Sequence, residues 1–142
     1  MHDFDGLLAI MGRELMLQRL HLLFNATCSS ALPDTTGLIG CYAQGNEPSH
    51  HVIFWYYLLG EHATARKYLD QVIRMYTDAS DGLPGNDDAG QMSAWLVVTM
   101  LGWYPVDPTS SSVLSFRPRV KLKGKTKRLA CLMGCHDALH HE

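Results

Sequence analysis

The stretch "DGLPGNDDAGQMSAW", residues 81–95, combines a polar turn with the start of an apolar run. The turn holds three aspartates and Asn86 among three glycines and one proline. Clusters of glycine and proline mark turns. The apolar run behind the turn predicts a buried helix over residues 91–102, which ends at Gly102. The sequence therefore predicts an acid-rich loop that is anchored by a buried helix.

A second polar stretch, "GNEPSHH" at residues 45–51, also leads into an apolar run. Pro48 suits the first turn of a helix, because its missing N–H group would be unpaired there in any case. Residues 49–59 are apolar on nearly all sides and predict another buried helix. Because both polar stretches directly precede a buried helix, we expect the two loops to lie at the same end of the molecule.

The other helical segments are amphipathic. Residues 7–24 carry apolar side chains near helical spacing, with a weak point at Gly12, and residues 61–78 show a similar pattern. No convincing strand precedes residue 112. Amphipathic helices that alternate with apolar ones predict an all-α fold of αα-hairpins, with the apolar helices on the inside.

Composition excludes several classes of protein. The chain has 142 residues, 46% of them hydrophobic and 18% charged, which is typical of a globular domain and not of a disordered or fibrous chain. The longest apolar run, "VIFWYYLL" at residues 52–59, is too short to span a bilayer. The first residues, "MHDFDG", are acidic where a signal peptide is basic. We therefore expect no membrane association and no signal peptide, and the compartment stays open.

Charge divides the chain into two parts. Residues 1–116 carry 5 basic and 12 acidic groups, whereas residues 117–142 carry 7 basic and 2 acidic groups. We place the boundary between a helical domain, residues 1–110, and an irregular basic tail, residues 111–142. The acidic body favours a metal ion or a neutral polar ligand over nucleic acid, and the tail predicts a solvated segment.

The cysteines show no regular framework. Cys28 and Cys41 are predicted to be buried free thiols rather than a disulfide. In the tail, cysteines and histidines have a spacing that zinc accepts, but nothing apolar surrounds them to hold a compact site, so zinc is not expected there (Cys131, Cys135, His136, His140 and His141). The segment "NAT" at Asn25 is a glycosylation sequon only if the chain enters a secretory pathway.

The residue types of the two loops allow a structural and a chemical interpretation. Asp87 and Asp88 precede a helix, so they can cap its first N–H groups, or they can act as acid and base. Asn46 and Glu47 offer the hard oxygen ligands that calcium prefers. Glu47 is alternatively a helix cap. The two histidines that enter the buried helix either bind a hydroxylated ligand or are satisfied core residues: His50 and His51.

Several long motifs together resemble glycoside hydrolase family 92, the calcium-dependent exo-α-mannosidases. These motifs are "HDFDGLLAIMGRE", "PDTTGLIGCYAQGNEPSHH", "DGLPGNDDAGQMSAW" and "LGWYPVDP", and the resemblance covers residues 2–110. It implies a fragment of a catalytic (α/α)6 barrel of helical hairpins. It also implies hydrolysis of terminal α-mannosides from N-glycans or mannans, with inversion of configuration and with Ca2+ as cofactor.

The resemblance also implies roles for individual residues. Asp88 would be the general base, and Asp87 and Asn86 would supply a second acid or position the water. Asn46 and Glu47 would lie at the calcium ion. The substrate, a mannose-terminated glycan, would meet four further residues: Gln44, Gly45, His50 and His51.

The family pattern is not complete in this sequence. Family members carry their general acid in an "EGN-x-W" segment upstream of the "HD" motif, and this sequence starts at "HD". We therefore expect an incomplete catalytic set, and the alternative function is an inactive sugar-binding remnant. A fragment of a closed helical ring would also leave apolar helix faces uncovered, which predicts self-association.

Overall fold

The computed structural model describes residues 3–28, 35–109 and 112–120. The described residues fall into two compact units, one within residues 5–93 and the other containing residues 94–109 and 112–120 together with residues 3–4. Helices dominate the described part, in agreement with the predicted helical class. The closed barrel remains a prediction.

The unit of residues 5–93 begins with two helices that follow the predicted amphipathic segment. Helices α1 (Phe4–Met11) and α2 (Arg13–Asn25) are separated at Gly12, whose φ of 75° is a conformation that glycine adopts most readily. The predicted weak point is confirmed. Met16, Leu17, Leu20 and Phe24 form the buried face of α2.

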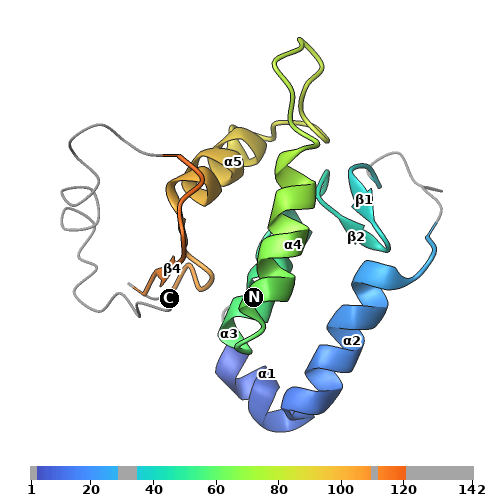
Figure 1. The fold of residues 1–142 in the computed structure, drawn as a ribbon, viewed down its shortest axis with the longest axis vertical. Coiled ribbons are helices and arrows are strands. Elements are labelled where there is room, and N and C mark those ends of the chain that lie inside the picture. Colours follow the sequence, from blue (N-terminus) through green and yellow to red (C-terminus); the bar gives the residue numbers. More distant parts are fainter. Residues whose placement is uncertain (1–2, 29–34, 110–111, 121–142) are drawn as a thin grey trace. The chain divides into compact units, whose positions relative to one another are not determined.

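Helix α4 (His62–Ile73) packs on α2 through aromatic side chains. Phe24 stacks on Tyr68 with ring centroids 4.4 Å apart and on Tyr42 at 4.7 Å. Figure 1 shows α2 and α4 as the two long helices of this unit. The amphipathic prediction for residues 61–78 is confirmed for the helix itself, although the helix ends five residues before residue 78.

The predicted buried helix of residues 49–59 is replaced by three short elements. They are the 3-10 helices η1 (Glu47–Ser49) and η2 (Val52–Phe54) and the α-helix α3 (Trp55–Leu58). The segment is buried as predicted, with Ile53, Phe54 and Tyr56 fully covered. Arg13 caps its end, since Nη2 donates to the Leu59 carbonyl at 2.9 Å.

Three short strands correct the prediction of a fold without strands before residue 112, two of them in this unit and the third, β3 (Trp103–Tyr104), in the other. Strands β1 (Leu38–Ile39) and β2 (Tyr42–Ala43) pair antiparallel through a tight turn at Gly40, where φ is 62°. The turn lies against the end of α2, because the Cys41 N–H donates to the Leu23 carbonyl at 2.7 Å.

That contact brings the two cysteines of this unit together. Cys28 follows the end of α2, and its Cα lies 5.1 Å from the Cα of Cys41, within the range of a disulfide. The structure forms this disulfide, so the prediction of free thiols was wrong. Spacing in the sequence gave no sign that the β1–β2 turn returns to the end of α2.

The second unit contains most of α5 (Gln91–Leu101) and a hairpin of β3 (Trp103–Tyr104) and β4 (Leu114–Ser115). Gly102, with φ of 85°, ends the helix as predicted. The prediction that this helix is buried was wrong in part, because Val97 on one face is 56% exposed. The predicted boundary at residues 110–111 and the cysteines and histidines of the tail lie outside the described residues. None of the helices in the described ranges has the length and apolar character needed to cross a bilayer.

Candidate active site

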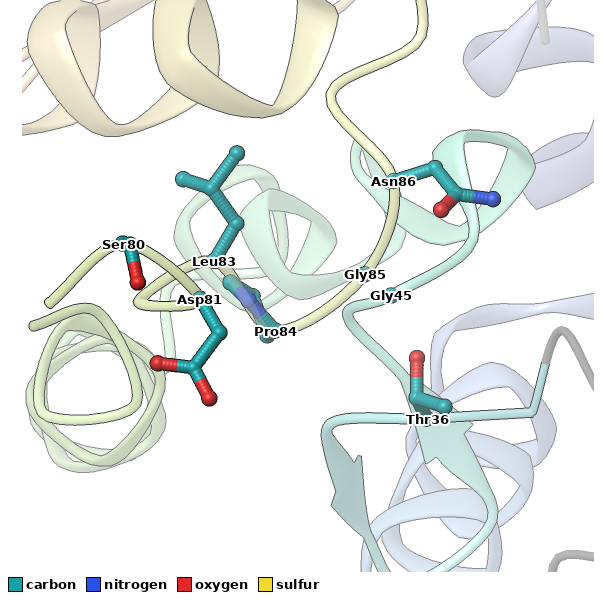
Figure 2. A pocket seen from close by; sticks show the side chains of 8 residues that line it. All are labelled: Thr36, Gly45, Ser80, Asp81, Leu83, Pro84, Gly85 and Asn86. Carbon is teal, nitrogen blue, oxygen red and sulfur yellow. The ribbon is translucent and has the colours of Figure 1, made fainter.

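The two polar loops meet in the unit of residues 5–93, as the sequence predicts. A Cβ atom placed on Gly85 would lie 2.6 Å from the Gly45 Cα, and one placed on Gly45 would lie 2.7 Å from the Pro84 carbonyl oxygen. Figure 2 shows the two glycines next to each other where the loops approach. Only glycine fits at these positions, because any side chain would push the backbones apart.

His50 joins the same two loops a second time. Its imidazole is buried, with Nε2 at 2.9 Å from the Gln44 carbonyl and Nδ1 at 3.3 Å from the Gln91 side-chain nitrogen. A carbonyl only accepts, so Nε2 carries the proton and Nδ1 accepts from Gln91. Burial lowers the pKa of His50, against the opposing effect of the Gln44 hydrogen bond, which favours this neutral form. The structure thus places His50 as a satisfied interior histidine between the loops.

His51 differs from its neighbour. Its Nε2 atom is buried and has no hydrogen-bond partner in the described part of the chain. Its ring meets Trp55 edge-on, with centroids 5.4 Å apart. Burial and the adjacent His50 lower the pKa of His51 from 6.5 to about 4, so the imidazole is neutral at neutral pH.

Gln44 lies beneath the first loop rather than on its surface. Its side chain is fully buried; Oε1 accepts from the Tyr42 hydroxyl at 2.6 Å, and Nε2 donates to the Tyr76 hydroxyl at 2.8 Å. Tyr76 in turn contacts Met92 at the start of α5. The structure therefore gives the Gln44 side chain a supporting position, whereas the sequence interpretation placed it against the substrate.

Asp87 and Asp88 are adjacent but are held differently. The Asp87 carboxylate accepts the backbone N–H of Ser93 at 2.9 Å, and its carbonyl accepts that of Met92 at 3.1 Å. Asp87 is therefore a cap for the N-terminus of α5. Asp88 is exposed, and its carboxylate accepts no hydrogen bond from the described residues.

The backbone turns left-handed at this point. Asp88, Ala89 and Gly90 have φ values of 40°, 56° and 91°. Positive φ is costly for residues with a side chain, and it concentrates at functional sites and tight turns. This conformation separates the carboxylates of the two neighbouring aspartates.

Asn46 and Glu47 begin the first 3-10 helix of the buried segment. Asn46 is exposed, and the Oε1 atom of Glu47 is buried. Carboxylate and amide oxygens, which these two residues carry, are donors of the kind that a hard cation accepts. Calcium takes about six to eight oxygen ligands, and the described residues contain no group of three or more acids, histidines or cysteines able to hold a metal. The pair therefore fits calcium only as part of a larger coordination sphere.

A pocket of about 400 Å³ opens where the loops meet (Figure 2). The sequence interpretation named Gly45 and Asn86 from its lining, but Asp81, Ser80 and Thr36 were not assigned. Asp81 was visible as an acid on the same turn, whereas Thr36 had no signal beyond its polar loop. The pocket is lined by eight residues: Thr36, Gly45, Ser80, Asp81, Leu83, Pro84, Gly85 and Asn86.

Comparison with known proteins gives consistent matches. The model of the glycosyl hydrolase family 92 catalytic domain matches residues 1–123. The solved family GH92 α-mannosidase BT3965 from Bacteroides thetaiotaomicron is 38% identical, with a TM-score of 0.71 over 80% of this chain. Its complex with mannoimidazole gives 39% identity and a TM-score of 0.74 over the same 80%.

A curated relative from Arthroderma benhamiae, described as an uncharacterized secreted glycosidase, is 39% identical over 62 residues, which is 43% of this chain and 8% of that protein. The chain spans 15% of the length of the solved mannosidase.

Proposed function

Because the chain belongs to glycosyl hydrolase family 92, we propose that it forms part of the catalytic domain of an α-mannosidase. The substrate class is a terminal α-mannoside of an N-glycan or mannan. Support comes from the similarity to a solved α-mannosidase, one of whose structures holds mannoimidazole. The observation that carries the proposal is the double junction of the two loops, at Gly45–Gly85 and at His50–Gln91.

We assign the general base to Asp88. Its carboxylate is exposed and accepts no hydrogen bond within the described part of the chain, so it is available to take a proton from water. Asn86 lies two residues away and lines the pocket, where its amide can orient that water. In an inverting glycosidase the second carboxyl group lies about 6.5–9.5 Å from the base and protonates the leaving oxygen.

Glu47 and Asn46 would contribute oxygen ligands to a calcium ion. When bound, the ion would supply a positive charge that holds sugar hydroxyls. Gly45 keeps the first loop against the second, and Gln44 supports it from below. His51 is the side chain we assign to a sugar hydroxyl, because its buried Nε2 has no partner among the described residues.

A second candidate is a sugar-binding segment without turnover. Asp87 favours this candidate, because its carboxylate already accepts the Ser93 N–H and is not offered as the second carboxyl group. The two candidates share the pocket and the substrate class. They differ in whether bound mannoside is cleaved.

One experiment separates them. The full chain is assayed with an aryl α-mannoside in the presence of calcium, and mannoimidazole binding is measured by calorimetry in parallel. Turnover that is abolished by Asp88→Asn, with mannoimidazole binding retained, supports the assigned base. The matched control is Asp78→Asn, an exposed acid ten residues before Asp88 in the sequence, which should leave turnover unchanged.

Binding without turnover in the unmodified chain supports the second candidate. Turnover that survives Asp88→Asn overturns the assignment of the base. Neither turnover nor binding, in a chain that unfolds cooperatively, overturns both candidates for this chain.

A further inference from the structure

The segment Asn25-Ala26-Thr27 is an Asn-X-Thr sequon that the proposed function does not use. Asn25, Asn46 and Asn86 are the three asparagines of the sequence, and only Asn25 has a hydroxyl residue two positions later. Asn25 is the last residue of α2, and Ala26 leaves the helix in an extended conformation with φ −69° and ψ 154°. Asn25 and Thr27 are both exposed, which suits a bulky, hydrophilic modification.

A disulfide begins at the residue that directly follows the sequon in the sequence. Cys28 forms a disulfide with Cys41. Disulfides form and persist in oxidising compartments and are rare in the cytosol. In eukaryotic cells the compartment in which disulfides form is also the one in which asparagine-linked oligosaccharides are attached. In a eukaryotic host, a chain with this disulfide would therefore mature in the compartment that the sequon requires.

We propose that Asn25 is an N-glycosylation acceptor and that the chain matures in a secretory compartment. The co-substrate is a lipid pyrophosphate-linked oligosaccharide, delivered by the membrane transferase. A bond forms between Asn25 Nδ2 and C1 of the first N-acetylglucosamine, and the bond from C1 to the pyrophosphate oxygen breaks. The lipid pyrophosphate leaves with the electron pair, and one Nδ2 proton passes to a base of the transferase. This inference stands on the sequon and the disulfide, independently of the proposed mannosidase activity.

The surroundings of Asn25 are compatible with the modification. Its Nδ2 donates to the His21 carbonyl at 2.7 Å and to the Tyr68 hydroxyl at 3.2 Å. A glycosylated amide keeps one N–H, so one of these two bonds is retained. The His21 bond is exposed and follows the helix, whereas Tyr68 is buried. We therefore expect the sugar to replace the exposed bond to His21, where it reaches solvent, and the bond to Tyr68 to be retained.

The test expresses the full chain behind a cleavable secretion leader in yeast. Peptide mapping without reduction examines the fragment that holds both Asn25 and the Cys28–Cys41 disulfide, before and after treatment with peptide N-glycanase. We expect an oligosaccharide on the disulfide-bonded fragment, and its removal should deamidate Asn25. Because transfer precedes the completion of folding, the microsomal fraction is mapped in the same way if secretion is poor.

Two variants identify the acceptor. Thr27→Ala keeps Asn25 and its hydrogen bonds but should abolish the modification, whereas Thr27→Ser should retain it. An unmodified Asn25 in the disulfide-bonded chain overturns the proposal. So does an oligosaccharide that occurs only on chains in which Cys28 and Cys41 are reduced, or one that persists in Thr27→Ala.

Discussion

Asp87 and Asp88 are neighbours on one turn, but their carboxylates make different contacts. The Asp87 carboxylate is turned back to the Ser93 N–H at the start of α5. The positive φ of Asp88 turns the next carboxylate away into solvent. A carboxylate at a helix N-terminus satisfies an unpaired N–H group and meets the positive end of the helix dipole. The two interpretations of the acid pair are therefore compatible: Asp87 is the helix cap, and Asp88 is the residue left available as a reacting group.

This division predicts opposite phenotypes for the two aspartates. Asp87→Ala removes a helix cap and should lower the free energy of unfolding by about 1 kcal/mol. Asp88→Asn should leave the free energy of unfolding nearly unchanged, because the Asp88 carboxylate accepts no hydrogen bond from the described residues. Urea unfolding followed by circular dichroism measures both. Equal losses in the two variants would contradict the division of roles.

The adjacent histidines predict a loss of stability in acid. A histidine with a folded-state pKa below its unfolded value contributes stability above that value, and the contribution is lost as the pH falls. His51, whose pKa falls from 6.5 to about 4, should lose its contribution between these pH values. The loss is bounded at about 3 kcal/mol. The lowered pKa of His50 acts in the same direction.

The free energy of unfolding, measured by urea titration from pH 8 to pH 4, tests this prediction. His51→Gln should flatten the decline below pH 6.5, because glutamine does not titrate. Arg19→Lys, at an exposed position of α2, keeps both histidines and is the control that should keep the wild-type slope. A flat wild-type profile would refute the link between histidine burial and acid sensitivity.

At the scale of elements, the contact of the two loops rests on glycine backbones. A Cβ on Gly85 would meet the backbone of Gly45, which cannot move aside as a flexible side chain could. Gly85→Ala should therefore cost about 1–3 kcal/mol as overpacking, and it should weaken mannoimidazole binding by opening the pocket. Gly60→Ala is a useful comparison, since Gly60 has φ of 80° but no atom within 4 Å of the place that a Cβ would take.

Gly60→Ala should cost only the strain of a left-handed alanine, roughly 1–2 kcal/mol, and leave binding unchanged. Thermal unfolding and calorimetry with mannoimidazole compare the two variants. If both weaken binding equally, the effect is one of global stability and not of the loop junction.

The elements that could be predicted from the sequence are those with a helical period of apolar residues or with a glycine that marks a helix end. The amphipathic helices, the break at Gly12 and the end of α5 at Gly102 all carry such signals. The strands β1 and β3 have only two residues each, too few for an alternating pattern to be seen. The apolar run before Gly60 was correctly predicted as buried, but hydrophobicity alone does not separate 3-10 turns from an α-helix.

The same distinction holds in the candidate site. The meeting of the loops followed from their common position before apolar segments, and the contact of Gly45 with Gly85 confirms it. The interior position of Gln44 could not be predicted from the sequence. It depends on hydrogen bonds to Tyr42 and Tyr76, and these two tyrosines are far apart in the sequence. The disulfide was missed for the same reason. Contacts between distant segments are set by tertiary packing, which a single sequence does not display.

At the scale of the whole molecule, apolar side chains remain uncovered. In the unit of residues 5–93, Ile10 is 85% exposed and Leu22 is 59% exposed, and Leu15 and Leu58 exceed one third. Single exposed apolar residues are common, but several large ones in so short a chain favour contact with another surface. The chain spans 15% of the length of the solved mannosidase.

We therefore expect the isolated chain to self-associate with rising concentration. Burying a leucine or isoleucine contributes about 1.5–3 kcal/mol, so a few such residues suffice for a weak complex. Sedimentation velocity over a wide concentration range measures this association. The double variant Ile10→Lys and Leu22→Lys should shift the onset to higher concentration, because both side chains lie on helix surfaces and not in the core.

A control double variant, Arg19→Lys and Gln18→Lys, adds one positive charge at exposed polar positions of α2 and should associate like the wild type. Association that is unchanged by the Ile10 and Leu22 substitutions would place the contact elsewhere. A wild-type chain that stays monomeric at all concentrations would mean that these side chains are tolerated in water. Because the expected driving force is apolar burial, added salt should not weaken the complex, whereas an association driven by charge would weaken with ionic strength.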